Sequence, residues 1–234
     1  TIRHRPPAID HSPTMNYFAH GLHHLDRPLF LAGTAVPDWM SVADRSVRVR
    51  PKLIEPLLND ESPGSAETAA GILRHFEDDD WFHSTRAFAL TTAELTQQFT
   101  KLLAGDDGMR PGFLGHIVTE MLLDAVLIAE HREEIDRYYD VLAEVNAADV
   151  QAVVNRCARG ETERLVTFIR LFLAERFLYD YLETPRLLHR LNQVLRRVRL
   201  QPLPMSALEV LENGRALVAQ RRDGLLPPSR YRRE

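Results

Sequence analysis

Apolar residues recur every three or four positions along most of this chain, which is the spacing that places them on one face of an α-helix. No stretch alternates convincingly between apolar and polar residues, so we expect no substantial β-sheet. Glycine, proline or threonine stands at the boundaries of the periodic segments. The main expected helices cover residues 66–83, 92–104, 113–131, 133–145, 149–160, 161–182, 184–200 and 205–224. The pattern therefore predicts an all-α single domain of about eight or nine helices.

The first part of the chain is less regular. Two short helical pieces are expected at residues 17–25 and 28–36, the second closed by Val36-Pro37-Asp38. Several prolines interrupt residues 41–64, which predicts a long loop with at most one turn. For the whole chain we expect an extended N-terminal arm at residues 1–14, an all-helical domain at 15–224 and a frayed basic tail at 225–234.

Composition narrows the classes of function. The chain has 234 residues and a net charge of −4, which argues against a general electrostatic grip on nucleic acid. We find no run of about 20 apolar residues, so a membrane span is not expected, and the first ten residues lack the apolar centre of a secretory signal. Cys157 is the one cysteine, which excludes an internal disulfide and fits a cytoplasmic location. The apolar side chains of residues 168–178 suit either the core or a homo-oligomer face.

Four of the ten histidines form a pattern with carboxylates. His75, Asp79 and His83 follow one another at steps of four, so they share one broad face of the expected helix. His116 and Glu120 repeat this spacing on the most apolar helix, which we expect to be central. Imidazole and carboxylate together suit Zn, Mn or Fe(II). The candidate metal ligands are His20, Asp38, His75, Asp79, His83, His116 and Glu120.

A structural interpretation competes with the metal at each position. An i, i+4 pair of histidine and carboxylate on an exposed helix is worth only about 0.2–0.5 kcal/mol and needs no ion. His116 and Glu120 fit this interpretation poorly because their neighbours are apolar, and buried ionisable groups are costly unless they are paired or bound to metal. Asp124, one turn later, is either a support for the ligands or an ordinary polar residue. Asp78 and Asp80 are expected to be solvated.

Several motifs resemble those of bacterial acyl carrier protein phosphodiesterases. They are MNYFAHGLHHL, GTAVPD, GILRHFEDDDWFH and GHIVTEMLLD, and the resemblance extends from Met15 to Glu130, about half of the chain. The resemblance implies an all-helical, metal-dependent hydrolase that releases phosphopantetheine from the carrier protein. Two departures are clear: Phe76-Glu77 replaces the family's basic pair, and His83 stands where the family has aspartate. The histidine suggests a softer metal such as Zn or Fe.

The same residues are also similar to zinc-dependent phospholipase C and its single-strand nuclease relatives. Those proteins present histidine and carboxylate ligands in the same order, around three zinc ions. This chain has no histidine between Asp38 and His75 and no processed N-terminal tryptophan. One or two divalent metal ions are therefore expected. Both resemblances imply a helical metallo-phosphoesterase, with the helices arranged around a central metal-binding cluster.

The expected activity is hydrolysis of a phosphoester by a metal-activated water. Asp38 or Asp79 would bridge two metals or act as the base, and the sequence does not decide between these roles. Arg74 and Arg86 are candidate contacts to the substrate phosphate, although a solvated role suits them equally well. The alternative is a non-catalytic helical interaction module derived from such an enzyme, with the basic C-terminal region docking an acidic partner.

Overall fold

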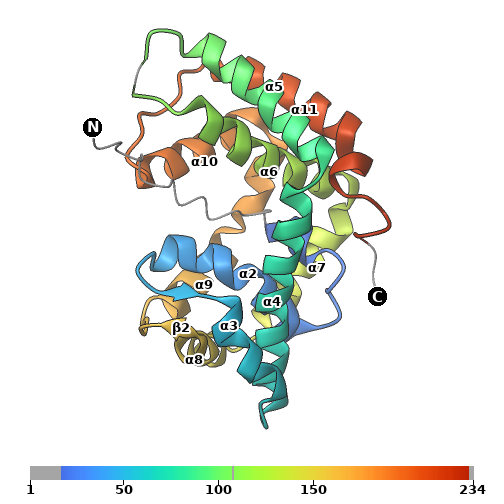
Figure 1. Cartoon of the computed structure of the whole chain (residues 1–234), viewed down its shortest axis with the longest axis vertical. Coiled ribbons are helices and arrows are strands. Elements are labelled where there is room, and N and C mark those ends of the chain that lie inside the picture. Colours follow the sequence, from blue (N-terminus) through green and yellow to red (C-terminus); the bar gives the residue numbers. More distant parts are fainter. Residues whose placement is uncertain (1–16, 107, 232–234) are drawn as a thin grey trace, which may run out of the picture.

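The computed structural model describes residues 17–106 and 108–231, and this part of the chain is almost entirely helical (Figure 1). The expectation of an all-α single domain is confirmed. The α-helices are α1 (Tyr17–Gly21), α2 (Pro28–Ala43), α3 (Pro51–Ile54), α4 (Pro63–His83), α5 (Arg86–Leu102), α6 (Pro111–Glu130), α7 (Arg132–Ala143), α8 (Ala147–Cys157), α9 (Leu165–Glu175), α10 (Thr184–Arg197) and α11 (Ala207–Leu225). Two 3₁₀-helices, η1 (Glu55–Asn59) and η2 (Phe177–Leu182), complete the helical elements.

Helix α6 is the core helix that its apolar sequence predicted. Pro111 stands at its first position, where proline favours the start of a helix, and α6 packs against both α5 and α11. By length and composition it is the one described helix that could cross a membrane, but 72% of the residues in its apolar stretch are buried inside the fold. Burial of this kind is typical of a core helix.

Helices α2 and α4 pack against each other at two glycines. A Cβ atom on Gly71 would lie 2.1 Å from the carbonyl oxygen of Phe30, and one on Gly33 would lie 2.3 Å from that of Thr68. Only glycine therefore allows the two backbones to approach this closely. The contact fixes the position of α4, which carries three of the predicted metal ligands.

The expected end of a helix at Pro37 is wrong, because α2 continues to Ala43 with this proline inside it. Proline removes one backbone hydrogen bond, which destabilises a helix. Here the residues on both sides are buried in the core, including Val36 and Trp39, and their packing outweighs the local loss. Asp38 consequently lies inside a helix and not at its end.

The irregular region and the start of one helix also differ from expectation. Residues 41–64 contain α3, η1 and strand β1 (Arg48–Val49), which pairs antiparallel with β2 (Ala158–Arg159). Two residues per strand are too few to give a period-two pattern. Helix α5 begins at Arg86, several residues before the expected start, because the Thr85 hydroxyl caps it by accepting the N–H of Phe88.

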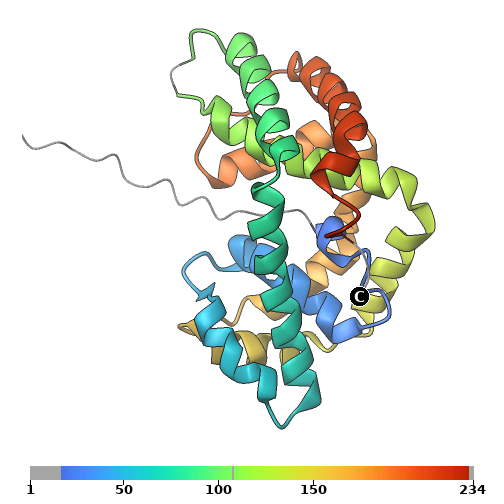
Figure 2. The same cartoon turned by 45° about the vertical axis from the view of Figure 1, so that its right-hand side comes forward.

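The tail predicted to fray is packed in its described part. Leu225 and Leu226 are buried, and the Tyr231 hydroxyl donates a hydrogen bond of 2.8 Å to the carbonyl of Ala19 in α1. Figure 2 shows the chain returning from the end of α11 toward α1. Apolar burial therefore holds a segment whose basic composition suggested disorder. Residues 1–14, expected to form an extended arm, and residues 232–234 lie outside the described residues.

Candidate metal centre

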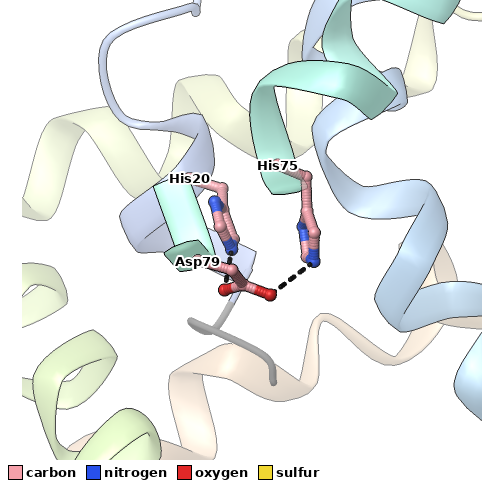
Figure 3. A group of neighbouring side chains, drawn as sticks. All are labelled: His20, His75 and Asp79. Atoms are coloured by element: carbon pink, nitrogen blue, oxygen red, sulfur yellow. Dashed lines mark ion pairs between the residues drawn. The ribbon is translucent and has the colours of Figure 1, made fainter. Parts of the chain in front are cut away.

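Three side chains from two helices meet in the interior, and we call them the inner triad: His20, His75 and Asp79. None is more than 2% exposed. Nε2 of His20 lies 3.5 Å from Oδ1 of Asp79, and Nε2 of His75 lies 3.3 Å from Oδ2. Both rings are directed at this one carboxylate (Figure 3). One ligand atom from each residue lies within 4.8 Å of the other two, so a single ion could contact all three.

The backbone of α2 orients His75. Its Nδ1 atom lies 2.8 Å from the carbonyl oxygen of Thr34, and since a carbonyl can only accept, Nδ1 donates. In a neutral ring this leaves the Nε2 lone pair facing Asp79. Metal-binding histidines almost always donate their other ring N–H to a carbonyl or carboxylate in this way. Burial, followed by the nearby charge of His20, lowers the pKa of His75, which favours the neutral form that binds metal.

His20 lies between two carboxylates. Its ring nitrogens make no hydrogen bond of normal geometry with the described residues, and they lie 3.5 Å from oxygens of Asp78 and Asp79. Burial opposes the charged ring, but these carboxylates outweigh burial and raise the pKa of His20 to about 10. The site therefore favours a positive charge at this point, which a proton or a metal ion can supply.

A second cluster, the outer triad, consists of His83, His116 and Glu120. Nε2 of each histidine lies 2.9 Å from Oε1 of the buried glutamate. The His83 and His116 side chains are 16% and 24% exposed, so this triad has access to solvent. Nδ1 of His83 donates to the carbonyl of Asp79 at 2.7 Å, which again leaves Nε2 to face the carboxylate. Burial opposes protonation of His116, yet Glu120 outweighs it and raises the pKa of His116.

Asp38 belongs to neither triad, but its carboxyl interacts with both. It is 4% exposed, and its Oδ2 atom makes no hydrogen bond with the described residues. Burial raises its pKa well above the usual range; the charge of His20 opposes this shift, whereas Asp79 and Glu120 add to it. A buried carboxyl oxygen without a hydrogen bond is costly unless a proton or a cation compensates it.

Asp124 holds the short helix α1 in place. Its two carboxylate oxygens accept the backbone N–H groups of Phe18 and Ala19, at 3.0 and 2.8 Å. Burial raises the pKa of Asp124 to about 7, and these two backbone hydrogen bonds oppose the rise. Because His20 directly follows Ala19, the carboxylate positions the one inner-triad ligand that α4 does not provide.

The expectation that Asp78 is solvated is wrong, whereas Asp80 is exposed as expected. Asp78 is 3% exposed and accepts hydrogen bonds from Nε of Arg74, at 2.8 Å, and from the indole N–H of Trp81, at 3.0 Å. Burial opposes its ionisation, but His20 and Arg74 outweigh burial and lower its pKa. Arg74 is therefore linked to the inner triad through Asp78. The three consecutive aspartates of α4 are thus divided between the interior, which receives Asp78 and Asp79, and the solvent, which receives Asp80.

Among the described residues, Arg86 makes no hydrogen bond or ion pair with either triad. It is exposed at the start of α5 and lines a shallow hollow with Leu90 and Arg221. The structure thus brings six of the seven predicted ligands into two triads, places Asp38 in electrostatic contact with both, and links only one of the two predicted arginines to them.

Both triads fit a divalent metal by their donor chemistry. Each supplies two imidazoles and one carboxylate, a set that suits Zn and Fe(II) and leaves further coordination positions open. The ring nitrogens of His20 and the Nε2 atom of His75 point to the same conclusion, because they make no hydrogen bond of normal geometry with the described residues and buried polar atoms are normally satisfied. The residues present could therefore hold one or two ions.

The sequence did not predict three contributors to the site: the Thr34 carbonyl, the buried Asp78 and the hydrogen bond from Tyr231 to Ala19, which we call the Tyr231 strap. Asp78 carried a weak signal, since it lies next to Asp79 and one turn after Arg74 on α4. The Thr34 carbonyl and the Tyr231 strap have no recognisable signal in the sequence. Comparison of the chain with protein-family models, with curated proteins and with solved structures gives no match.

Proposed function

We propose that this chain is a metal-dependent phosphoester hydrolase that uses one or two divalent ions, Zn, Mn or Fe, to activate water. One observation carries the proposal: two triads of two histidines and a carboxylate lie beside the buried Asp38. Each triad brings three ionisable side chains together, and those that are buried are costly to fold unless something compensates them. A bound metal ion would offset this cost and would also make the arrangement catalytic.

A bound divalent ion would supply an acidified water and neutralise charge on the phosphoryl oxygens. The chain would hold ions through Nε2 of the histidines, oriented by the Thr34 and Asp79 carbonyls. The exposed edge of the outer triad gives water and substrate a way in. Asp38, whose Oδ2 makes no hydrogen bond with the described residues, would accept a proton from water, and Asp79 would help to hold the ions.

The resemblance to acyl carrier protein phosphodiesterases suggests one substrate class, a carrier-linked phosphopantetheine. The resemblance to zinc-dependent phospholipase C suggests a small phosphodiester. Both substrates contain a phosphodiester, so we propose this bond as the one cleaved.

The test is to measure bound metal in protein purified without added metal, then turnover of bis(4-nitrophenyl) phosphate. We expect close to stoichiometric metal and measurable turnover, both reduced in the His75→Ala and His116→Ala variants. His189→Ala is the matched control, because His189 is exposed and its side chain hydrogen-bonds only to Gln193 among the described residues. Full activity in both site variants, or wild-type protein that binds no metal, would exclude the proposal.

A further inference from the structure

The two triads offer the same donor atoms but differ in their access to solvent. No residue of the inner triad is more than 2% exposed. In the outer triad the His83 and His116 side chains are 16% and 24% exposed, and only Glu120 is buried. Structural zinc sites are closed, whereas catalytic sites keep one coordination position open to water or substrate. The two triads match these two kinds of site.

The residues around the inner triad are buried as well. Asp78, whose carboxylate lies 3.5 Å from Nδ1 of His20, is 3% exposed. Thr34, whose carbonyl accepts a hydrogen bond from His75, is fully buried. Water or a chelator therefore reaches an ion at this triad only after a local opening of the fold. Such openings are rare where the side chains are packed in the core.

Helix α1 is the segment whose opening would expose the inner triad. It has five residues, and a helix this short has little stability of its own. Besides apolar packing, the hydrogen bonds to Asp124 and the Tyr231 strap hold it in place. An ion shared by His20 of α1 and the two ligands of α4 would add a further connection between these helices (Figure 3). Metal binding at this triad is therefore coupled to the docking of α1.

The outer triad needs no such opening. His83 is the last residue of α4, and His116 lies in the second turn of α6, so both come from long helices of the core. Their rings stack with centroids 5.0 Å apart, and the ring of Phe88 packs against both. Helix packing thus holds these rings in place without an ion. Their exposed edge lets an ion and its water enter and leave.

We propose that the inner triad holds a structural ion that exchanges slowly, and that the outer triad holds an exchangeable ion at which water and substrate bind. This inference rests on the proposed function, which supplies the divalent metal, and it goes beyond that function by giving the two triads different roles. The protein can then lose its activity without losing its fold.

The test is the rate of metal release from the full chain loaded with two equivalents of Zn²⁺. An excess of the chromogenic chelator 4-(2-pyridylazo)resorcinol removes each ion and reports its release. We expect two phases of one ion each, with the slow phase on the order of a hundredfold slower than the fast phase. Protein that has lost only the fast ion should keep a melting temperature close to that of the loaded protein. It should lack turnover of bis(4-nitrophenyl) phosphate and regain it when Zn²⁺ is restored.

Variants assign each phase to a triad. His116→Ala should bind one ion and show only the slow phase, and His75→Ala should bind one ion and show only the fast phase. Tyr231→Phe leaves both ligand sets intact, so it tests the role of α1 directly. It should accelerate only the slow phase, by about fivefold, because one hydrogen bond between neutral groups changes an opening equilibrium by this factor. Arg230→Ala, at the exposed neighbouring position, is the control and should change neither phase.

Four results would overturn the inference while leaving the hydrolase proposal intact. They are equal release rates for the two ions, a single bound ion in the wild-type protein, turnover that persists after the fast ion has left, and an unchanged slow phase in Tyr231→Phe. Two phases that follow the two triads as expected, without turnover in the loaded protein, would instead exclude the hydrolase and leave the two kinds of metal site.

Discussion

The rings of His20 and His75 stack face to face, with centroids 4.0 Å apart and planes 26° from parallel, although they come from different helices. Two imidazoles this close cannot both carry a proton without strong repulsion. The pKa values follow this constraint, since that of His20 is raised and that of His75 is lowered. The stack therefore presents one favoured cation position and one free lone pair to the same carboxylate.

Metal ions should stabilise the fold. We expect Zn²⁺ to raise the free energy of unfolding by about 2.7 kcal/mol when its free concentration is a hundred times the Kd. Thermal unfolding with and without Zn²⁺, and after addition of a chelator, measures this shift. His75→Ala should lose most of the gain and His189→Ala should retain it. An unchanged melting temperature with Zn, Mn and Fe alike would contradict the prediction.

Gly71→Ala should lower the free energy of unfolding by about 3 kcal/mol, because a methyl group at the α2–α4 contact forces the helices apart. Gly112→Ala is the control, since a Cβ atom there meets nothing within 4 Å. That variant should be neutral or more stable by up to about 1 kcal/mol, because alanine favours helix. Denaturant unfolding of both variants compares them directly, and equal effects would mean that the helices are not in close contact.

Asp124→Ala should lower the free energy of unfolding by about 3 kcal/mol, because it leaves two buried N–H groups of α1 without their acceptor. It should also weaken Zn²⁺ binding, since α1 carries His20. Asp80→Ala, on the exposed face of α4, should change neither quantity. If the two variants behave alike in urea unfolding and metal titration, then Asp124 does not anchor α1.

Tyr231→Phe should cost about 1 kcal/mol, the contribution of one hydrogen bond between neutral groups. The ring would keep its contact with His23, whose centroid lies 4.5 Å away, so the effect isolates the hydroxyl. Arg230→Ala, at the exposed neighbouring position, is the control. Amide hydrogen exchange at Ala19 and His20 should increase only in the tyrosine variant. Equal exchange in both variants would mean that the Tyr231 hydroxyl does not hold α1.

The Cys157 thiol should be nearly inert in the folded protein. Burial raises its pKa to about 11, so at pH 8 only about one thiol in a thousand is ionised, and the thiolate is the reactive form. A chromogenic disulfide reagent should react slowly with native protein and rapidly after denaturation. Rapid reaction in the native state would show that α8 opens readily.

The spacing of apolar residues was sufficient to predict the fold class and the central position of α6, because a long, strongly apolar helix has to be buried. It also placed the candidate ligands of α4 and of α6 on shared helix faces, since i, i+4 spacing depends on helix geometry alone. It did not divide the ligands into two triads, because that depends on which helices pack together. The predictions for Pro37 and for the tail were wrong for the same reason. Local preferences indicated a helix end at Pro37 and disorder in the tail, whereas tertiary packing stabilises both segments.

Helix α4 contributes to both triads and to the Arg74–Asp78 pair, so it sets the distance between the two clusters. Each residue advances an α-helix by 1.5 Å, so the backbone positions of His75 and His83 are about 12 Å apart along one rigid axis. Neither triad can shift toward the other without unwinding the helix that both share. The spacing between the two ligand sets is therefore inherited from backbone geometry, and is insensitive to changes in the surrounding loops.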